Sequence, residues 1–297
     1  MKANYLIPFV LLLFLAFAGC ETTNYSEDAG AFQITNNGEL VLDLSDIELY
    51  DFSTHIIYLN ENNRLNGDFD KLNGAVVTVD GQELYTLRIQ ELYSSTMHPG
   101  PQIFRMTDTF GDFAFRISFV SWTDGTFPAP VDPRGNAKIR DAMKRQGKLR
   151  DGLALEILSI ESEGALVKTK IRLRNIDSFS YYHLDPGKMG NGLFHFFTNG
   201  LSFFNPTVQS YVYDQSVSEA PEPWNYWSKE WLSEIQPNES KELVFTYNLG
   251  AVPAGQELRF SFDFPSPSLA IKSRNDLDIK GSRIWLGSIG DSKVVRF

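Results

Sequence analysis

Four aromatic residues stand close together late in the sequence: Trp224, Tyr226, Trp227 and Trp231. Flat, rigid indole rings can stack on the apolar C–H faces of sugar rings, and polar neighbours can bind the hydroxyl groups. Pro223 suits the first turn of a short helix, which would align the three tryptophans at i, i+3 and i+7. The cluster therefore indicates either a carbohydrate-binding platform or an apolar stripe that packs on the protein's own core.

The sequence contains few residues that could form a metal site. Of the four histidines, His183 and His195 flank one loop, and Asp185 gives a third potential ligand. A zinc site takes three or four protein ligands, and a histidine in a strand between aromatic residues is more often structural. Asp185 and Asn191 lie in the Gly-rich segment 181–192, but their spacing does not match an EF-hand calcium loop. We therefore expect no metal site, and interpret 181–192 as a shaped loop.

The motifs of common enzymes are absent from the sequence. It contains no His-Glu-x-x-His helix, no Gly-x-Ser-x-Gly elbow and no phosphate-binding Gly-Lys-Ser loop. We therefore expect no catalytic residues and no cofactor. The 37 acidic residues could still supply the two carboxylates that glycoside hydrolysis needs. A hydrolase accordingly stays open as an alternative.

The only cysteine, Cys20, follows an apolar stretch near the amino terminus. Lys2 gives that terminus a positive charge, and the apolar run from Leu6 to Phe17 is shorter than the roughly 20 residues that span a bilayer. Such a run suits the hydrophobic region of an export signal. Two small residues, Ala18 and Gly19, directly precede the cysteine.

This terminus resembles the lipobox of bacterial lipoproteins. The resemblance implies a signal peptide over residues 1–19, cleavage before Cys20, and fatty acylation of Cys20 as a membrane anchor. The polar residues up to 31 then form a flexible tether. We expect the protein in the cell envelope, on the outer membrane, at its periplasmic or its surface face. A single cysteine permits no disulfide within the chain, so stability must come from a hydrophobic core.

Composition favours two strand-rich domains and excludes one class of partner. A chain of 297 residues is long enough for two domains of ordinary size. Its formal net charge of −10 should repel nucleic acid, so we expect no nucleic-acid partner. Aromatic residues make up 13 % of the chain, and such residues favour strands and fill sandwich cores.

The first domain is expected over residues 32–127. Strands are predicted at 39–44 and 55–59, and Asp80-Gly81 between apolar runs is typical of a type I′ hairpin turn. Phe113, Phe115, Ile117 and Phe119 alternate with smaller or polar residues. That period of two predicts one strand with four large groups on one face.

A linker with a short basic helix is expected over 128–151. Asp132 and Pro133 suit a helix start, the side chains of Ile139, Ala142 and Met143 share one face, and Gly147 suits its end. The surrounding basic residues indicate either a docking patch for an anionic partner or a solvated face at the domain junction. They are Arg134, Lys138, Arg140, Lys144, Arg145, Lys148 and Arg150.

The second domain is expected over 152–297. A strand at 153–160 precedes a run in which Val167, Thr169, Ile171 and Leu173 alternate with basic residues, and further strands are predicted at 242–249 and 257–264. The turn at 235–240 and the strand end Arg174-Asn175 resemble those of bacterial immunoglobulin-like domains. The resemblance implies a β-sandwich with a long insertion at about 185–234.

Together these patterns predict an all-β protein of two tandem antiparallel, immunoglobulin-like β-sandwich domains joined by a short helix. The lipobox, the tandem strand-rich domains and the aromatic cluster resemble glycan-binding surface lipoproteins of polysaccharide-utilising bacteria. We therefore expect a non-catalytic binding module that binds a polysaccharide or an envelope protein. The alternatives are a structural or adhesin subunit, which predicts an apolar patch or an unpaired strand edge, and a glycoside hydrolase.

Overall fold

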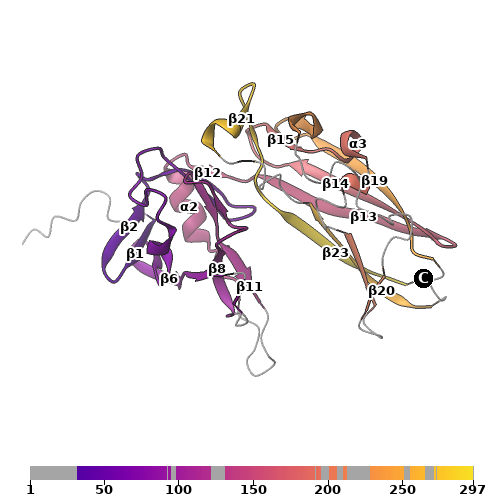
Figure 1. Cartoon of the computed structure of the whole chain (residues 1–297), viewed down its shortest axis with the longest axis horizontal. Helices are drawn as coiled ribbons and strands as arrows, with labels where there is room; N and C mark the ends of the chain where they lie inside the picture. Colours follow the sequence, from indigo (N-terminus) through magenta and orange to yellow (C-terminus); the bar gives the residue numbers. More distant parts are fainter. Residues whose placement is uncertain are drawn as a thin grey trace, which may run out of the picture.

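The structure, a computed structural model, consists of two strand-rich bodies placed side by side (Figure 1). It describes residues 32–91, 93–94, 98–121, 131–190, 192–194, 201–205, 210–212, 228–250, 255–264, 271 and 273–296. Most of the paired strands are antiparallel, and the predicted all-β fold is confirmed. In this part of the chain, no helix has the length and apolar character needed to cross a bilayer.

The first body contains three sheets and one helix. Their strand orders are β2-β1-β5-β6, β12-β3-β4-β10-β9 and β11-β8-β7. The elements are β1 (Gln33–Asn36), β2 (Glu39–Asp43), β3 (Ile47–Asp51), β4 (Ile56–Leu59), η1 (Phe69–Leu72), β5 (Val76–Val79), β6 (Gln82–Thr86), β7 (Arg88–Gln90), β8 (Gly100–Phe104), β9 (Thr109–Phe110), β10 (Ala114–Arg116), β11 (Ser118–Val120), α2 (Ala137–Arg145) and β12 (Leu149–Arg150).

The predicted hairpin between β5 and β6 is confirmed. Val79 pairs with Gln82, so the turn consists of Asp80 and Gly81. Their φ angles are 53° and 72°. Both residues are thus in the left-handed region that a type I′ turn requires, which glycine adopts freely and aspartate tolerates better than most residues.

The expected single strand from Phe113 to Phe119 is two strands in different sheets. β10 pairs with β4, whereas β11 pairs with β8, and Ile117 separates them. Phe113 packs in the core of the second body, while Phe115 and Ile117 pack in the core of the first. The alternation therefore correctly marked Phe113, Phe115 and Ile117 as buried, but Ala114 is fully buried too and Phe119 is only partly buried. The chain changes sheets within the run, which a period of two does not reveal.

Helix α2 belongs to the first body. Ile139, Ala142 and Met143 are fully buried in its core, as the predicted face requires. The helix is capped by Asn136, whose side chain accepts from the Lys138 backbone N–H, and not by Asp132 as expected. The following strand β12 pairs in parallel with β3, so the segment assigned to a linker closes the first body.

The second body also contains three sheets. Their orders are β13-β14-β19, β18-β15-β22-β21 and β17-β16-β20-β23. The elements are β13 (Leu153–Glu163), β14 (Leu166–Asn175), β15 (Tyr181–Leu184), α3 (Pro186–Met189), β16 (Leu201–Asn205), β17 (Ser210–Val212), η2 (Lys229–Trp231), β18 (Leu232–Ile235), β19 (Ser240–Asn248), β20 (Glu257–Phe264), η4 (Arg274–Asp276), β21 (Asp278–Ile279), β22 (Ser282–Ile284) and β23 (Ile289–Arg296).

Aromatic rings fill the core of the second body. Phe245 on β19 lies 5.2 Å from Phe262 on β20, and Phe203 on β16 lies 4.8 Å from Phe260, both between ring centroids. Strand β16 comes from the segment expected to be an insertion, yet it pairs with β20 inside the sheet. The sandwich therefore draws on this segment for a core strand. The finer immunoglobulin-like assignment stays a prediction.

The two bodies meet at a buried joint around Asp51 and Trp285. The indole N–H of Trp285, 1 % exposed, donates to the Asp51 carboxylate at 3.0 Å. Ser53 donates to the same carboxylate from its backbone and its hydroxyl. Burial raises the pKa of Asp51, while these hydrogen bonds partly offset the rise. A Cβ on Gly152 would collide with Ser53 and Asp51, so this glycine allows the close approach.

Charged residues surround this joint. Glu48 on β3 binds two arginines of the second body, Arg274 at 2.6 Å and Arg283 at 2.7 Å. Arg116 on β10 donates to the Leu286 carbonyl at 2.9 Å. Core residues of the first body, such as Tyr58, belong to the same buried cluster as Trp285. The core of the second body therefore extends into the first, and two ion pairs on Glu48 cross the joint.

Replacing Trp285 with phenylalanine tests the joint. Trp285→Phe keeps a buried ring but removes the only indole donor to Asp51, so a buried carboxylate loses one of its hydrogen bonds. We expect the free energy of unfolding to fall by about 1–3 kcal/mol in urea titrations. The control Val294→Ala, at a side chain 61 % exposed, should change it by less than about 0.5 kcal/mol. Equal midpoints for Trp285→Phe and wild type would contradict this account.

Candidate functional site

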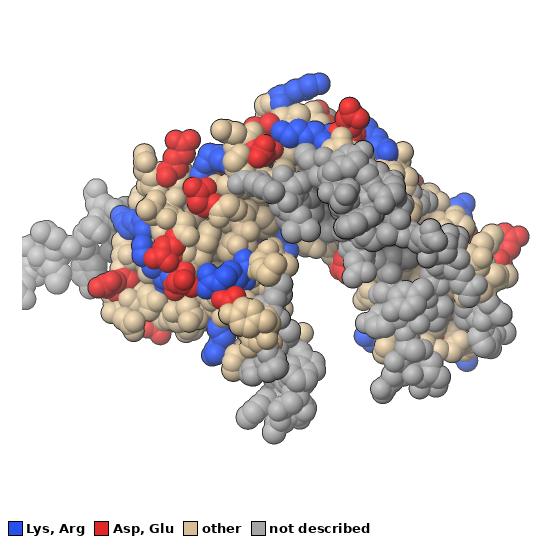
Figure 2. All heavy atoms as spheres, in the orientation of Figure 1, with Lys and Arg blue, Asp and Glu red and all other residues tan. Residues whose placement is uncertain are grey.

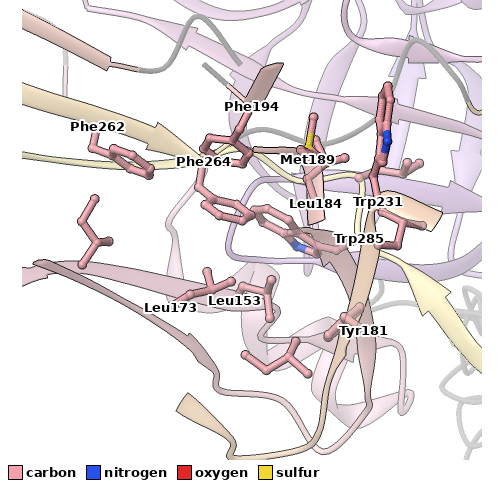
Figure 3. Close-up of a cluster of buried hydrophobic side chains, with 14 of the residues drawn as sticks. Leu153, Leu173, Tyr181, Leu184, Met189, Phe194, Trp231, Phe262, Phe264 and Trp285 are labelled. Carbon is pink, nitrogen blue, oxygen red and sulfur yellow. The ribbon is translucent and has the colours of Figure 1, made fainter. Parts of the chain in front are cut away.

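The aromatic cluster predicted to bind carbohydrate is only partly described. Trp224, Tyr226 and Trp227 lie outside the described residues, as does Cys20. Trp231 ends η2 and is 9 % exposed. Its ring belongs to the buried cluster that also contains Met189, Leu184 and Trp285 (Figure 3). At Trp231, therefore, the structure shows the packing alternative.

The residues considered as metal ligands have structural partners. The Asp185 carboxylate caps α3 by accepting from the Gly187 backbone N–H at 2.8 Å, and its other oxygen accepts from the Ser233 hydroxyl. His183 is 1 % exposed, and burial lowers its pKa to about 4. His195 and Asn191 lie outside the described residues. In the described ranges no three His, Cys, Asp or Glu side chains gather as a metal site would require.

The basic residues around α2 mostly bind the protein itself. Arg140 pairs with Asp151 at 2.7 Å, Arg145 pairs with Asp80 at 3.3 Å, and Arg134 pairs with Asp132 at 2.6 Å. Figure 2 shows positive and negative side chains intermixed over the first body. These contacts favour the solvated, internally paired face over a docking patch.

A pocket of about 530 Å³ lies on the second body beside β15 and β18. Its volume falls within the range of about 300–1,000 Å³ that small-molecule sites occupy. Ten residues from six helices or strands and one turn surround it, and four of them are lysines. They are Tyr182, Lys188, Lys229, Glu230, Leu232, Ser233, Glu234, Lys241, Ile279 and Lys280. We call this cavity the lysine pocket.

Tyr182 supplies the aromatic wall of the lysine pocket. On β15 its neighbours Tyr181 and His183 point to the core, and the period of two turns the half-buried Tyr182 to the other side. Tyr182 pairs with Glu234 on β18 and with Ile284 on β22. Its carbonyl accepts from the Trp285 backbone N–H at 2.9 Å. The joint between the two bodies thus holds the strand that carries this ring.

Two lysines bind the outer edge of β18. Lys188 Nζ donates to the Leu232 carbonyl at 2.5 Å, and Lys241 Nζ donates to the Glu234 carbonyl at 2.5 Å. The Trp231 carbonyl accepts from the Asp185 N–H on the β15 side. Because successive carbonyls alternate along a strand, those of residues 232 and 234 point away from β15. The two ammonium groups therefore line the free edge of the sheet.

His183 contacts Lys241 from the core side of β15 and helps to orient its ammonium group. Its Nδ1 lies 2.7 Å from the Leu184 carbonyl, which can only accept, so Nδ1 carries the proton. Nε2 is then an acceptor, and Lys241 Nζ lies 3.4 Å from it. With a pKa of about 4, His183 is neutral at pH 7 and does not repel the ammonium group.

Glu234 is fixed as a carboxylate in the pocket wall. The Ser282 hydroxyl donates to Glu234 at 2.6 Å, and Ser180 lies 2.6 Å from Ser282 between hydroxyl oxygens. The hydrogen bond from Ser282 is the largest cause that lowers the pKa of Glu234, and the nearby charge of Lys241 adds to it. The pocket therefore offers fixed acceptors as well as cationic donors.

The comparisons with known protein families and curated proteins found no match. No model of a known protein family matches the chain, and no curated protein matches it. The lysine pocket was also missed by sequence reasoning. Its residues come from separate segments between 182 and 280, so no local motif joins them, and scattered lysines are common on surfaces. The shaped loop expected at 181–192 is wrong over Tyr181–Leu184, which form strand β15, and over Pro186–Met189, which form helix α3.

The lowered pKa of His183 predicts a pH-dependent stability. Between pH 6.5 and about 4 the unfolded state binds a proton on this residue while the folded state does not. The free energy of unfolding therefore falls as pH decreases through this window, by up to about 3 kcal/mol. His183→Gln should lose less stability than wild type between pH 7 and 4.5 in urea titrations.

Burial also lowers the pKa of His55 to about 4, so His55→Asn should likewise lose less stability than wild type over this pH range. Parallel pH profiles for wild type and both variants would refute this assignment.

Proposed function

We propose that the protein is a lipid-anchored, non-catalytic binding module of the bacterial cell envelope, and that its lysine pocket binds a glycan. The second body would then be an immunoglobulin-like sandwich that presents the pocket beside the joint. The proposal rests on the pocket's combination of one aromatic face with hydrogen-bond donors and acceptors. Sugars need both, because they have apolar C–H faces and a rim of hydroxyl groups.

Tyr182 is the observation that carries the proposal. Its backbone is fixed by pairing with β18 and β22, and its half-buried ring packs against the core cluster. A ring held in place loses little conformational entropy when a ligand stacks on it. Around it, Lys188 and Lys241 can donate hydrogen bonds, and Glu234 can accept them. This arrangement supports binding through stacking and hydrogen bonds together.

The electrostatics of the pocket favour binding over hydrolysis. A glycoside hydrolase needs one carboxylic acid whose pKa is raised, so that it can protonate the leaving group. The pKa of Glu234 is lowered, and its carboxylate is already engaged by Ser282. Glu234 is therefore suited to accept a hydrogen bond from a hydroxyl group and poorly suited to act as the general acid.

The anchor rests on the lipobox resemblance at Cys20. If Cys20 carries the fatty acids, the polar residues 21–31 connect the membrane to Phe32 at the start of the first body. A chain of that length reaches at most about 40 Å. The two bodies would then stay near the membrane surface while sampling many orientations, which suits a module that captures large polysaccharides.

Binding to polysaccharides tests the glycan site. We expect one or more glycans in an affinity-electrophoresis panel to retard the full mature chain, and Tyr182→Ala to weaken that binding about tenfold through loss of stacking. Tyr93→Ala is the matched control, because Tyr93 is a tyrosine of the first body that is 88 % exposed. Trp224→Ala and Trp227→Ala in the same panel test the rest of the aromatic cluster. If no glycan retards the wild-type protein, the proposal fails and the structural or assembly role becomes the better account.

Mass spectrometry of the native protein tests the anchor. We expect a mature chain that begins at Cys20 and carries several fatty acyl groups, because one chain gives only marginal membrane binding. Cys20→Ser should leave the export signal uncut. A mature protein that retains an unmodified Met1, or that starts beyond Cys20 without fatty acid, would disprove the anchor.

A further inference from the structure

We propose that the ligand of the lysine pocket is an acidic glycan, whose carboxylate or sulfate oxygens bind the ammonium groups of Lys188 and Lys241. This inference rests on the proposed function and names its ligand class. Four of the ten residues around the pocket are lysines, against two glutamates. The pocket therefore has a local positive charge on a chain whose formal net charge is −10.

The charge of the pocket is not cancelled by ion pairs. Within the described residues, Lys229 is the one pocket lysine with a carboxylate in range, at 4.0 Å from Asp276. Lys188 and Lys241 donate to main-chain carbonyls, which are dipoles without net charge. Glu234 attracts Lys241 at longer range, but its own oxygens accept from Ser282. An anionic ligand can therefore supply the counter-charge that these ammonium groups lack.

The sheet formed by β13, β14 and β19 provides a contrast. Arg172 on β14 binds Glu156 and Glu242, and Lys170 binds Glu242. The charges of these two side chains are thus matched by carboxylates of the same sheet. The lysine pocket differs because its cations bind carbonyls, and this difference selects it as the anion site.

Both ammonium groups keep donors for a ligand. An ammonium group has three N–H donors. Lys188 uses one on the Leu232 carbonyl, and Lys241 uses one on the Glu234 carbonyl and one on His183. Residues 232 and 234 are two apart on an extended strand, so their carbonyls are about 7 Å apart. A carboxylate or sulfate of the ligand can therefore accept from either ammonium group, with a hydrogen bond of about 2.8 Å.

Edge protection alone does not explain the pocket. Lysines on a sheet edge prevent pairing with other chains, and Lys188 and Lys241 serve that purpose on β18. The same purpose does not require Lys229 on η2 or Lys280 after β21, which place further charge around the cavity. It also does not require the aromatic wall of Tyr182. Stacking on this ring and charge along the edge together match a sugar that carries an acidic group.

Matched pairs of polysaccharides separate charge from ring chemistry. Polygalacturonate and its methyl ester share one sugar, and only the former carries carboxylates. Carrageenan and its desulfated form make the corresponding sulfated and neutral pair. We expect the full mature chain to bind one acidic member at least tenfold more tightly than its neutral partner, and to lose that preference between 50 and 500 mM NaCl because salt screens the charges. The member that binds distinguishes carboxylate from sulfate.

Variants then assign the preference to the two lysines. Lys188→Gln and Lys241→Gln should each weaken binding of the acidic polysaccharide about tenfold, and the neutral partner should change little. Lys188→Arg and Lys241→Arg keep the charge and should retain most of the preference. Lys168→Gln on the exposed face of β14 is the matched control for total charge. Thermal unfolding of each variant verifies that it is folded. If Lys241→Gln does not fold, Lys188→Gln alone decides the test.

The outcomes separate this inference from the proposed function. Equal affinity for acidic and neutral partners, with loss of binding in Tyr182→Ala, would overturn the acidic ligand and leave the glycan site intact. A preference for acidic polysaccharide that Lys188→Gln and Lys241→Gln do not change would place the anion site elsewhere and overturn the inference. Absence of binding to every glycan would overturn both.

Discussion

The hydrogen bond from the Trp285 indole to the buried Asp51 carboxylate is the contact on which the arrangement of this protein depends. It joins β3 of the first body to the segment after β22 in the second. The same residue donates its backbone N–H to the Tyr182 carbonyl. One residue therefore connects the joint, through its side chain, to the strand that carries the pocket's aromatic wall, through its backbone. Because Asp51 is buried, a carboxylate left without hydrogen-bond partners there would destabilise the folded state.

The ion pairs around Glu48 extend this dependence to the other wall of the pocket. Arg274 on η4 precedes β21, Arg283 lies on β22, and both bind Glu48 in the first body. Ile279 and Lys280 of that hairpin line the pocket. The first body thus supports the pocket, although none of its described residues lines it. The ligand surface that we propose therefore depends on both bodies.

Local patterns in the sequence predicted much of the fold. The alternation on β14, the Asp80-Gly81 turn and the buried face of α2 all follow from short-range geometry, and the structure confirms them. Predictions failed where tertiary pairing decides the outcome. The chain changes sheets at Ile117, and the segment expected as an insertion supplies strand β16. No period in the sequence records which strand will pair with which.

The candidate site shows the same division. Sequence reasoning emphasised tryptophans, because their chemistry is conspicuous, and the structure buries Trp231 in the core. No single lysine of the pocket stands out in the sequence as a candidate binding residue. Their significance comes from the edge of β18, where Lys188 and Lys241 bind successive outward carbonyls. The edge position that protects the strand from pairing also presents two unneutralised charges to a ligand, so stability and recognition use the same groups.

A crystal structure of the full mature protein with an acidic oligosaccharide tests the central claim most directly. The account predicts a sugar ring against Tyr182 and an anionic oxygen within hydrogen-bond distance of Lys188 or Lys241 Nζ. An oligosaccharide bound at another surface, with the lysine pocket empty, would contradict it.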